Sequence, residues 1–117
     1  MDAAARAAHH SQLVMDRLRE AFHGFQVRVH DGHRPLCRSF IVDIVKDRPP
    51  FYEPYCQKAL HIRRPVLEDE RTDDELLRGL EEPLERLVHS RGNCAITLCY
   101  DDYGEMVIVG QHDIQPS

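Results

Sequence analysis

The chain has 117 residues, of which 42% are hydrophobic and 30% are charged, and its formal net charge is −5. This length fits one domain, residues 1–117, and the composition is too apolar for a disordered chain. No stretch approaches the roughly 20 apolar residues of a membrane helix, and the N-terminal residues lack the apolar run of a secretory signal. We therefore expect a cytoplasmic protein that binds no membrane.

The negative charge is concentrated in one segment. Eight acids and two arginines lie between Glu68 and Glu82, which gives this segment a net −6 and the rest of the chain about +1. A chain without a broad basic surface has little with which to neutralise phosphates, so we expect no nucleic-acid partner. We interpret the segment as the solvated face of a helix, and a surface for a basic partner is the alternative.

The first part of the chain predicts a helix followed by a β-hairpin. Residues Ala3–Phe22 combine high helix propensity with apolar residues at helical spacing, and Gly24 is suited to end the helix. The first five residues are expected to fray. Phe25–His30 and Leu36–Val45 alternate apolar and polar side chains around a turn-forming Asp-Gly pair, as the strands of a hairpin do.

The middle of the chain is harder to interpret. Lys46–Gln57 holds three prolines among three aromatic residues, which predicts an irregular Pro/aromatic loop. Two alternatives remain open for Lys58–Leu67. Its apolar residues alternate like those of an edge strand, but Pro54 could instead start a short helix that ends at His61.

Thr72–Ser90 predicts a second long helix. Thr72 and Glu75 have the spacing of a capping box, and leucines repeat at helical intervals behind them. Pro83 lies in the middle of this pattern, so we expect it to kink the helix or to split it in two.

The C-terminal part predicts a second hairpin, formed by Cys94–Tyr100 and Glu105–Gln111. A three-residue turn at 102–104 would pair Leu98 with Ile108. Both faces of this hairpin are apolar or small, which is typical of strands that are covered on both sides. The face directed away from the helices would carry four residues: Thr97, Cys99, Val107 and Val109.

These elements predict an α+β fold with two layers, in which two long helices cover one face of an antiparallel sheet of four or five strands. The residues expected in the core are apolar members of the predicted helices and strands. They are Val14, Leu18, Phe22, Val27, Phe40, Val42, Leu80, Leu84, Ile96, Leu98 and Ile108.

Histidine and cysteine residues suggest one candidate metal site. His30, His33 and Cys37 lie around the turn of the first hairpin and have side chains that bind soft metals, and His61 or His112 could complete a tetrahedral zinc site. The CxxC pairs of structural zinc sites do not occur in the chain, and idle turn histidines are the alternative. We therefore expect reduced cysteines, no structural zinc and no cofactor.

Four other residues are candidates for binding a ligand or a partner. Arg38 falls on the apolar face of its strand, where a guanidinium could line an anion pocket or extend its charged end into solvent. Phe51, Tyr52 and Tyr55 belong to the predicted Pro/aromatic loop, where aromatic side chains could form a contact surface or pack at the edge of the core.

Two functional hypotheses follow. The chain contains no phosphate-binding loop, nucleophile elbow or other catalytic motif, which favours a non-catalytic protein-interaction or regulatory module that acts as a homodimer, with a further protein as a second partner. The alternative is a small-ligand-binding or enzymatic domain with a pocket near the first hairpin and the Pro/aromatic loop. Whether the protein is an enzyme stays open, with a non-catalytic role favoured.

Overall fold

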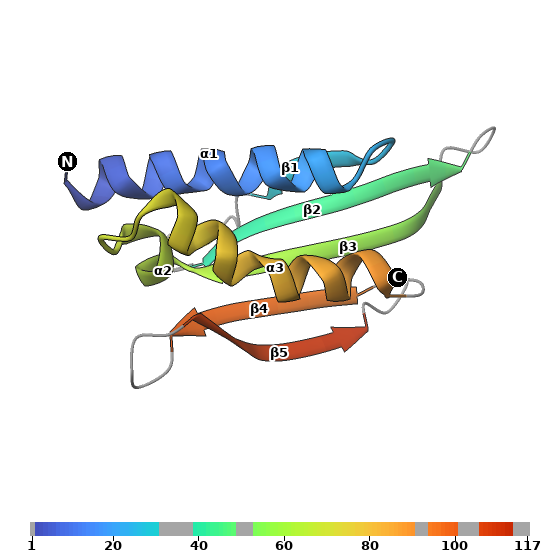
Figure 1. Cartoon of the computed structure of the whole chain (residues 1–117). Helices are drawn as coiled ribbons and strands as arrows, with labels where there is room; N and C mark the ends of the chain where they lie inside the picture. The colour runs from blue at the N-terminus through green and yellow to red at the C-terminus, as the bar shows by residue number, and fades with distance from the viewer. Residues whose placement is uncertain (1, 31–38, 49–52, 91–93, 101–105, 114–117) are drawn as a thin grey trace.

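A computed structural model of the chain describes residues 2–30, 39–48, 53–90, 94–100 and 106–113. These residues form three helices and five strands (Figure 1). The helices are α1 (Ala3–Ala21), α2 (Arg64–Glu68) and α3 (Asp73–His89). The strands are β1 (Gln26–His30), β2 (Ser39–Arg48), β3 (Glu53–Arg63), β4 (Cys94–Tyr100) and β5 (Met106–Asp113). No helix in these ranges has the length and apolarity needed to cross a bilayer.

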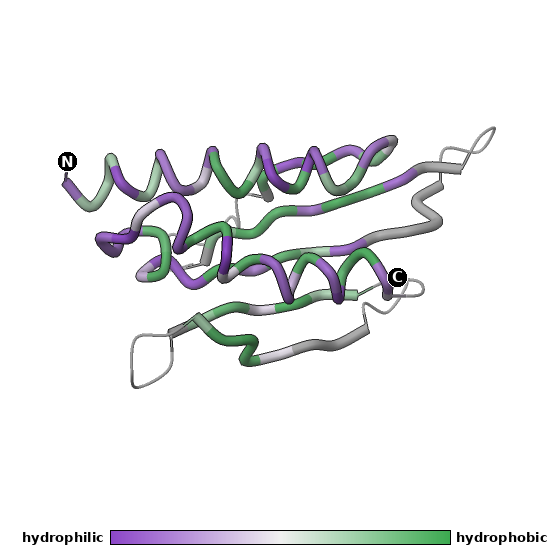
Figure 2. Tube along the Cα trace, in the orientation of Figure 1, coloured by the Kyte–Doolittle hydropathy of each residue, from purple (hydrophilic) through white to green (hydrophobic). Residues whose placement is uncertain are grey.

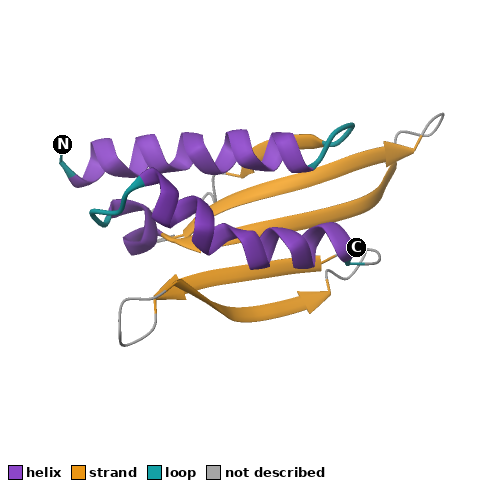
Figure 3. Ribbon diagram, in the orientation of Figure 1, coloured by secondary structure: helices purple, strands orange, loops and turns teal. Residues whose placement is uncertain are grey.

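The strands form one sheet in the order β1-β2-β3-β4-β5, and the helices lie in a layer on one side of it (Figure 3). The predicted two-layer α+β class with two long helices is thus confirmed. One pairing differs from the antiparallel sheet predicted: β3 and β4 are parallel, which makes the sheet mixed. The reason is that α2 and α3 connect these two strands, and such a crossover returns the chain in its original direction.

Helix α1 begins and ends close to the predicted positions. The Asp2 side chain caps its first turn, because its carboxylate accepts a hydrogen bond of 2.7 Å from the amide of Ala5. After the C-cap residue Phe22, Gly24 has a φ of +84°, which is a left-handed conformation that glycine adopts without a steric penalty. The chain can therefore turn sharply from α1 into β1. The expected fraying of the first five residues stays a prediction.

The prediction of an irregular segment at Lys46–Gln57 is wrong for most of its length. Strand β2 continues to Arg48 and β3 already begins at Glu53, so the two strands form a long hairpin. Residues 49–52 lie outside the described residues. Pro54 is tolerated because β3 pairs with β4 only from Lys58 onward, so at Pro54 it has a neighbour on one side. A register shift, which leaves Tyr55 without a pairing partner in β2, also falls at this point.

The segment Lys58–Leu67 combines the two alternatives that its sequence left open. Strand β3 continues to Arg63, and helix α2 begins at Arg64 with Pro65 in its first turn. A helix that starts at Pro54 is therefore wrong. Proline at a first helical turn costs no hydrogen bond, since the amide there would have no partner within the helix.

Helix α3 is a single element of 17 residues, so Pro83 does not split it, and the alternative of a kink at Pro83 stays a prediction. Thr72 is the N-cap of α3, as the predicted capping box requires. The Thr72 hydroxyl lies 3.2 Å from the Glu75 amide, from which it accepts a hydrogen bond, and 3.1 Å from Oε1 of the Glu75 carboxylate. Pro83 is buried and supplies apolar surface to the core, which helps to offset the backbone hydrogen bond that it cannot donate.

The hydrophobic core lies between the helix layer and the sheet. Figure 2 shows hydrophobic stretches of β2, β3 and β4 running beneath the helices. All the predicted core residues are either fully buried there or packed against the buried cluster. The structure adds apolar residues from every element between β2 and β4: Ile44, Leu60, Ile62, Val66, Leu67, Leu76, Leu87 and Cys94.

The C-terminal hairpin has the predicted register at its turn end, where Leu98 pairs with Ile108 and Cys99 pairs with Val107. The register then shifts, so that Thr97 pairs with Gly110 and Val109 is the extra residue. This β-bulge was not predicted. It bends β5, which is an edge strand of the sheet.

A buried lysine joins the two layers. Lys58 lies on the helix-facing side of β3 and is only 3% exposed. Its Nζ lies 2.5 Å from the carbonyl oxygen of Leu87, 3.0 Å from that of Ser90 and 2.7 Å from Oγ of Ser90. The three ammonium hydrogens thus have three acceptors at the C-terminus of α3, where carbonyl groups lack partners within the helix and the dipole favours a cation.

Leu98→Ala should destabilise the protein by about 2–5 kcal/mol, because the Leu98 side chain is 0% exposed and its removal leaves a cavity beneath α3. Urea unfolding followed by circular dichroism measures the change. Val88→Ala is the matched control, since Val88 is 45% exposed on α3 and its truncation should change the stability by less than about 0.5 kcal/mol. Equal effects of the two substitutions would contradict the placement of Leu98.

Lys58→Met should lower the free energy of unfolding by about 1.5–3 kcal/mol, because the acceptors of Leu87 and Ser90 then lose a charged donor. Amide hydrogen exchange should also accelerate in the last turn of α3. Lys46→Met is the control: the Lys46 ammonium lies 5.4 Å from the centre of the Phe25 ring in a half-buried position, and its loss should cost less than about 1 kcal/mol. A smaller loss for Lys58→Met than for Lys46→Met would show that the link to α3 does not contribute.

Candidate interaction surface

The second face of the sheet is the candidate site. Side chains alternate along each strand, so every second residue is directed away from the helices, and none of the described helices packs on that side (Figure 3). We call this side the open face. The strand register places twelve described side chains on it: Gln26, Arg28, Ile41, Asp43, Val45, Ala59, His61, Arg63, Ala95, Thr97, Cys99 and Val107.

Small side chains occupy the centre of the open face. Ala59 of β3 and Ala95 of β4 are neighbours in the parallel pairing, and both are buried. Val45, on the adjoining strand β2, is also buried. Because alanine side chains extend little above the sheet, another surface could approach the backbone closely here.

A patch of partly exposed side chains adjoins these alanines, and we call it the open-face patch. Ile41, His61 and Thr97 form one row across three strands, and Cys99 pairs with Val107 in the next row. All five side chains are half-buried. Val109, at the bulge of β5, is 56% exposed and is the most exposed large hydrophobic residue of the described chain. The patch therefore combines apolar surface with a few polar groups.

Charges of both signs lie around the open-face patch. Arg28 of β1 is the direct neighbour of Asp43 of β2, and Arg63 at the end of β3 is exposed. Cross-strand neighbours of opposite sign favour each other. A surface with both signs suits contact with a copy of itself, because a two-fold axis brings each patch onto the same patch of the other copy.

None of the predicted site residues has a described side chain. Five of them lie outside the described residues: Arg38, Phe51, Tyr52, His33 and Cys37. The backbones of His30 and Tyr55 belong to β1 and β3, but their side chains are not described. Their assignment to ligand, partner or metal binding therefore stays a prediction.

Two cysteines are described, and both are free thiols. Cys94 is buried in the core, whereas Cys99 is half-buried on the open face, so they lie on opposite faces of β4 as predicted. Within the described ranges, no group of three or more histidine, cysteine or acidic residues could hold a metal ion.

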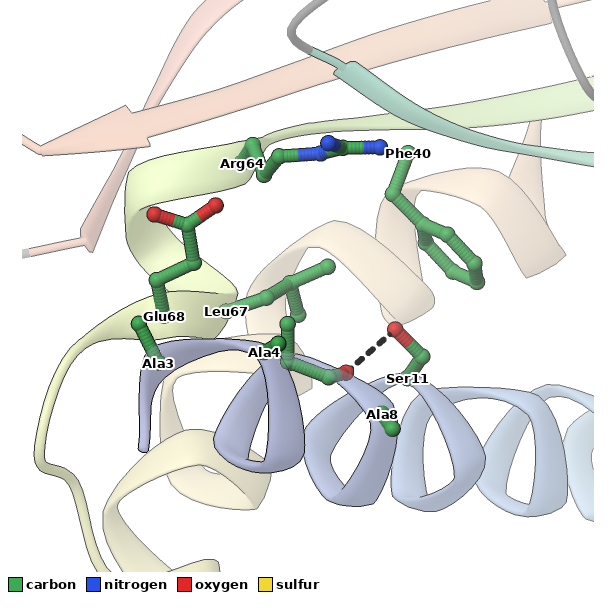
Figure 4. A pocket seen from close by; sticks show the side chains of 9 residues that line it. Ala3, Ala4, Ala8, Ser11, Phe40, Arg64, Leu67 and Glu68 are labelled. Carbon is green, nitrogen blue, oxygen red and sulfur yellow. Dashed lines mark hydrogen bonds between the residues drawn. The ribbon is translucent and has the colours of Figure 1, made fainter. Parts of the chain in front are cut away.

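A groove with a cavity volume of about 470 Å³ lies between α1 and α2 and is also lined by Phe40 of β2 (Figure 4). Alanine residues of α1 form one wall, and Phe40 of β2 and Leu67 of α2 add apolar surface. Arg64 and Glu68 lie at its rim on α2. Among the described residues, neither side chain has a hydrogen bond or an ion pair.

Sequence reasoning missed two buried polar side chains, His10 and Lys58. Each lies in an apolar pattern: His10 precedes Val14 and Leu18 at intervals of four in α1, and Lys58 alternates with Leu60 and Ile62 in β3. A polar residue in such a stripe signals that it needs a buried partner. Its partner cannot be identified from the sequence, because it lies in a distant segment.

Comparisons with known proteins do not assign a family. No protein-family model matches the chain, and neither the curated proteins nor the solved structures contain a significant match.

Proposed function

We propose that the protein is a non-catalytic protein-interaction module that acts as a homodimer, and that the open face is its dimer interface. The observation that supports this proposal is the open-face patch next to a centre lined by alanine. Contiguous apolar surface on an otherwise polar small protein usually marks an interface. A second copy of the chain can cover the open face without any other protein, and two-fold dimers are the commonest soluble oligomers.

Contact through the face of the sheet is favoured over contact through its edges. Strand β1 is short, with five residues, and the bulge at Val109 interrupts the regular hydrogen-bonding pattern of β5. Both features hinder the addition of a strand at an edge. Two open faces packed together would instead bury side chains from all five strands, and a stable interface of this kind needs about 800 Å² from each copy.

A further protein partner is part of the same proposal. The Pro/aromatic segment, with Phe51, Tyr52 and Tyr55, is the candidate contact surface for it, because aromatic side chains contribute large contact areas at a low entropic cost. The described ends of β2 and β3 that flank this segment extend beyond the helix layer (Figure 1). A partner bound there would leave the open face accessible to the second copy.

The groove between α1 and α2 supports a second candidate function, the binding of a small ligand with an apolar body and a charged group. Its volume of about 470 Å³ falls within the range of ligand pockets. The alanine wall would contact the apolar body. Arg64 and Glu68, which have no described partner, would interact with the charged group.

Filling the groove tests this second function. A panel of small apolar carboxylates and amines at millimolar concentration should raise the melting temperature of the wild type, because a ligand that binds only the folded state stabilises it. Ala8→Leu should abolish the shift by occupying the space against α1, while Val88→Leu, on the exposed side of α3, should not. Absence of a shift in the wild type, or its persistence in Ala8→Leu, would exclude a site in this groove.

Sedimentation equilibrium at micromolar concentration tests the homodimer. We expect twice the monomer mass of 13.6 kDa. Val107→Glu should return the protein to the monomer mass and leave the helical circular dichroism signal intact, because it places an unpaired charge in the interface alone.

Val88→Glu is the matched control for this experiment. It introduces the same charge at an exposed valine of α3, remote from the open face, and should leave the protein dimeric. A wild-type mass of 13.6 kDa that does not change on concentration would exclude the homodimer. A dimer that persists in Val107→Glu would place the interface elsewhere.

A further inference from the structure

His10 is a buried histidine whose two ring nitrogens both face backbone carbonyl groups. Its side chain lies on α1, and the residue is only 2% exposed. Nδ1 lies 2.7 Å from the carbonyl oxygen of Leu67 in α2, and Nε2 lies 3.2 Å from that of Arg71 in the connection between α2 and α3. One side chain thus links α1 to two consecutive segments that lie far from it in the sequence.

A carbonyl oxygen can only accept a hydrogen bond. A neutral imidazole carries one N–H and could therefore donate to Leu67 or to Arg71, but not to both. The imidazolium carries two N–H groups and satisfies both acceptors. In the neutral form, the bare ring nitrogen would face a carbonyl oxygen, so that two acceptor atoms would be held against each other.

The charged groups around His10 nearly cancel. Arg6 and His9 of α1 line the same cavity as His10, together with Glu70, Arg71 and Asp73 of the α2–α3 connection and the start of α3. The two arginines disfavour a further positive charge, and the two carboxylates favour it. The N-terminal dipole of α3 also disfavours it, but the acids in the first turn, Asp73, Asp74 and Glu75, oppose this effect. Burial of the ring disfavours the positive charge, and the hydrogen bonds to the two carbonyl groups oppose this cost.

We propose that His10 is a protonation-dependent latch that holds the first half of α1 against α2 and the α2–α3 connection. With both nitrogens protonated, the latch is closed. When a rise in pH removes one of these two protons, one of the two hydrogen bonds is lost and the first turns of α1 loosen. The second half of α1 does not depend on the latch, since Val14, Met15 and Leu18 bury it in the core.

Two neighbouring side chains act in the same direction. His9 Nε2 lies 2.8 Å from Asp73 Oδ1, so its protonation adds an ion pair between α1 and α3. Arg6 donates a hydrogen bond of 2.8 Å to the carbonyl oxygen of Glu68. Its guanidinium stays charged when the histidines are neutral. The two histidines thus make the attachment of α1 dependent on pH, and Arg6 keeps it from being lost altogether.

The ¹⁵N spectrum of the histidine side chains tests the latch in the unmodified protein. At pH 6, Nδ1 and Nε2 of His10 should both have the chemical shifts of protonated nitrogens, and each should show a hydrogen-bonded proton. His10→Gln identifies the signal. A neutral tautomer at pH 6, with one bare nitrogen, would overturn the proposal, and this result does not depend on how well any variant folds.

Amide hydrogen exchange tests the consequence for α1. Between pH 6 and pH 8, after correction for the intrinsic pH dependence of exchange, protection of residues 5–12 should fall about fivefold, the scale of one net hydrogen bond. Protection of residues 14–20 should stay constant. In His10→Gln, the pH dependence at residues 5–12 should be reduced to the part that His9 contributes, and in the double variant with His9→Gln it should disappear.

His23→Gln is the matched control, because His23 is an exposed histidine just beyond the end of α1. It should leave the pH dependence of residues 5–12 unchanged. Equal pH dependence in His10→Gln and the wild type, or a loss of protection spread evenly over α1, would show that His10 does not control this helix.

Discussion

The parallel pairing of β3 with β4 is the constraint on which the rest of the structure depends. Parallel neighbours cannot be joined by a tight turn, so the chain must cross over between Arg63 and Cys94. The crossover consists of α2 and α3, which cover the same face of the sheet as α1 (Figure 1). All the described helices thus lie on one side of the sheet. None of them covers the open face, whose central side chains are small and apolar.

Two buried polar side chains hold the helices α3 and α1 in place. Lys58 binds the C-terminus of α3 to the central strand β3, and the proposed imidazolium of His10 binds α1 to the start of the crossover. Each uses backbone carbonyl groups as acceptors, which no substitution of the partner residue can remove. Lys58 thus orients α3 relative to the sheet and His10 orients α1 relative to α2, whereas apolar packing alone would permit small sliding movements.

The sequence predicted elements whose signals are local. The structure confirms three such signals, each of which depends on residues a few positions apart. They are the alternation in Cys94–Tyr100, the N-cap at Thr72 and the helical spacing in Ala3–Phe22. The sequence did not predict the ends of β2 and β3 near Pro54, because a proline argues against a strand. Pro54 is tolerated since the pairing of β3 with β4 begins only at Lys58, which the local sequence does not reveal. The partners of His10 lie 57 and 61 residues away, so no local pattern could identify them. The sequence did indicate an uncovered apolar face, because both faces of the last two strands are apolar or small. It did not predict the alanine residues at the centre of that face.

Thiol labelling at Cys99 tests the central proposal, that the open face packs against a second copy. Cys99 lies within the open-face patch, and Cys94 on the same strand is buried in the core and serves as the internal reference. Alkylation followed by peptide mass analysis measures the labelling rate of each thiol over a range of protein concentrations. The account predicts that Cys99 reacts readily in dilute protein and becomes protected as the concentration rises, while Cys94 stays unreactive throughout. A Cys99 labelling rate that is the same at every concentration, in protein that sediments as a dimer, would contradict it.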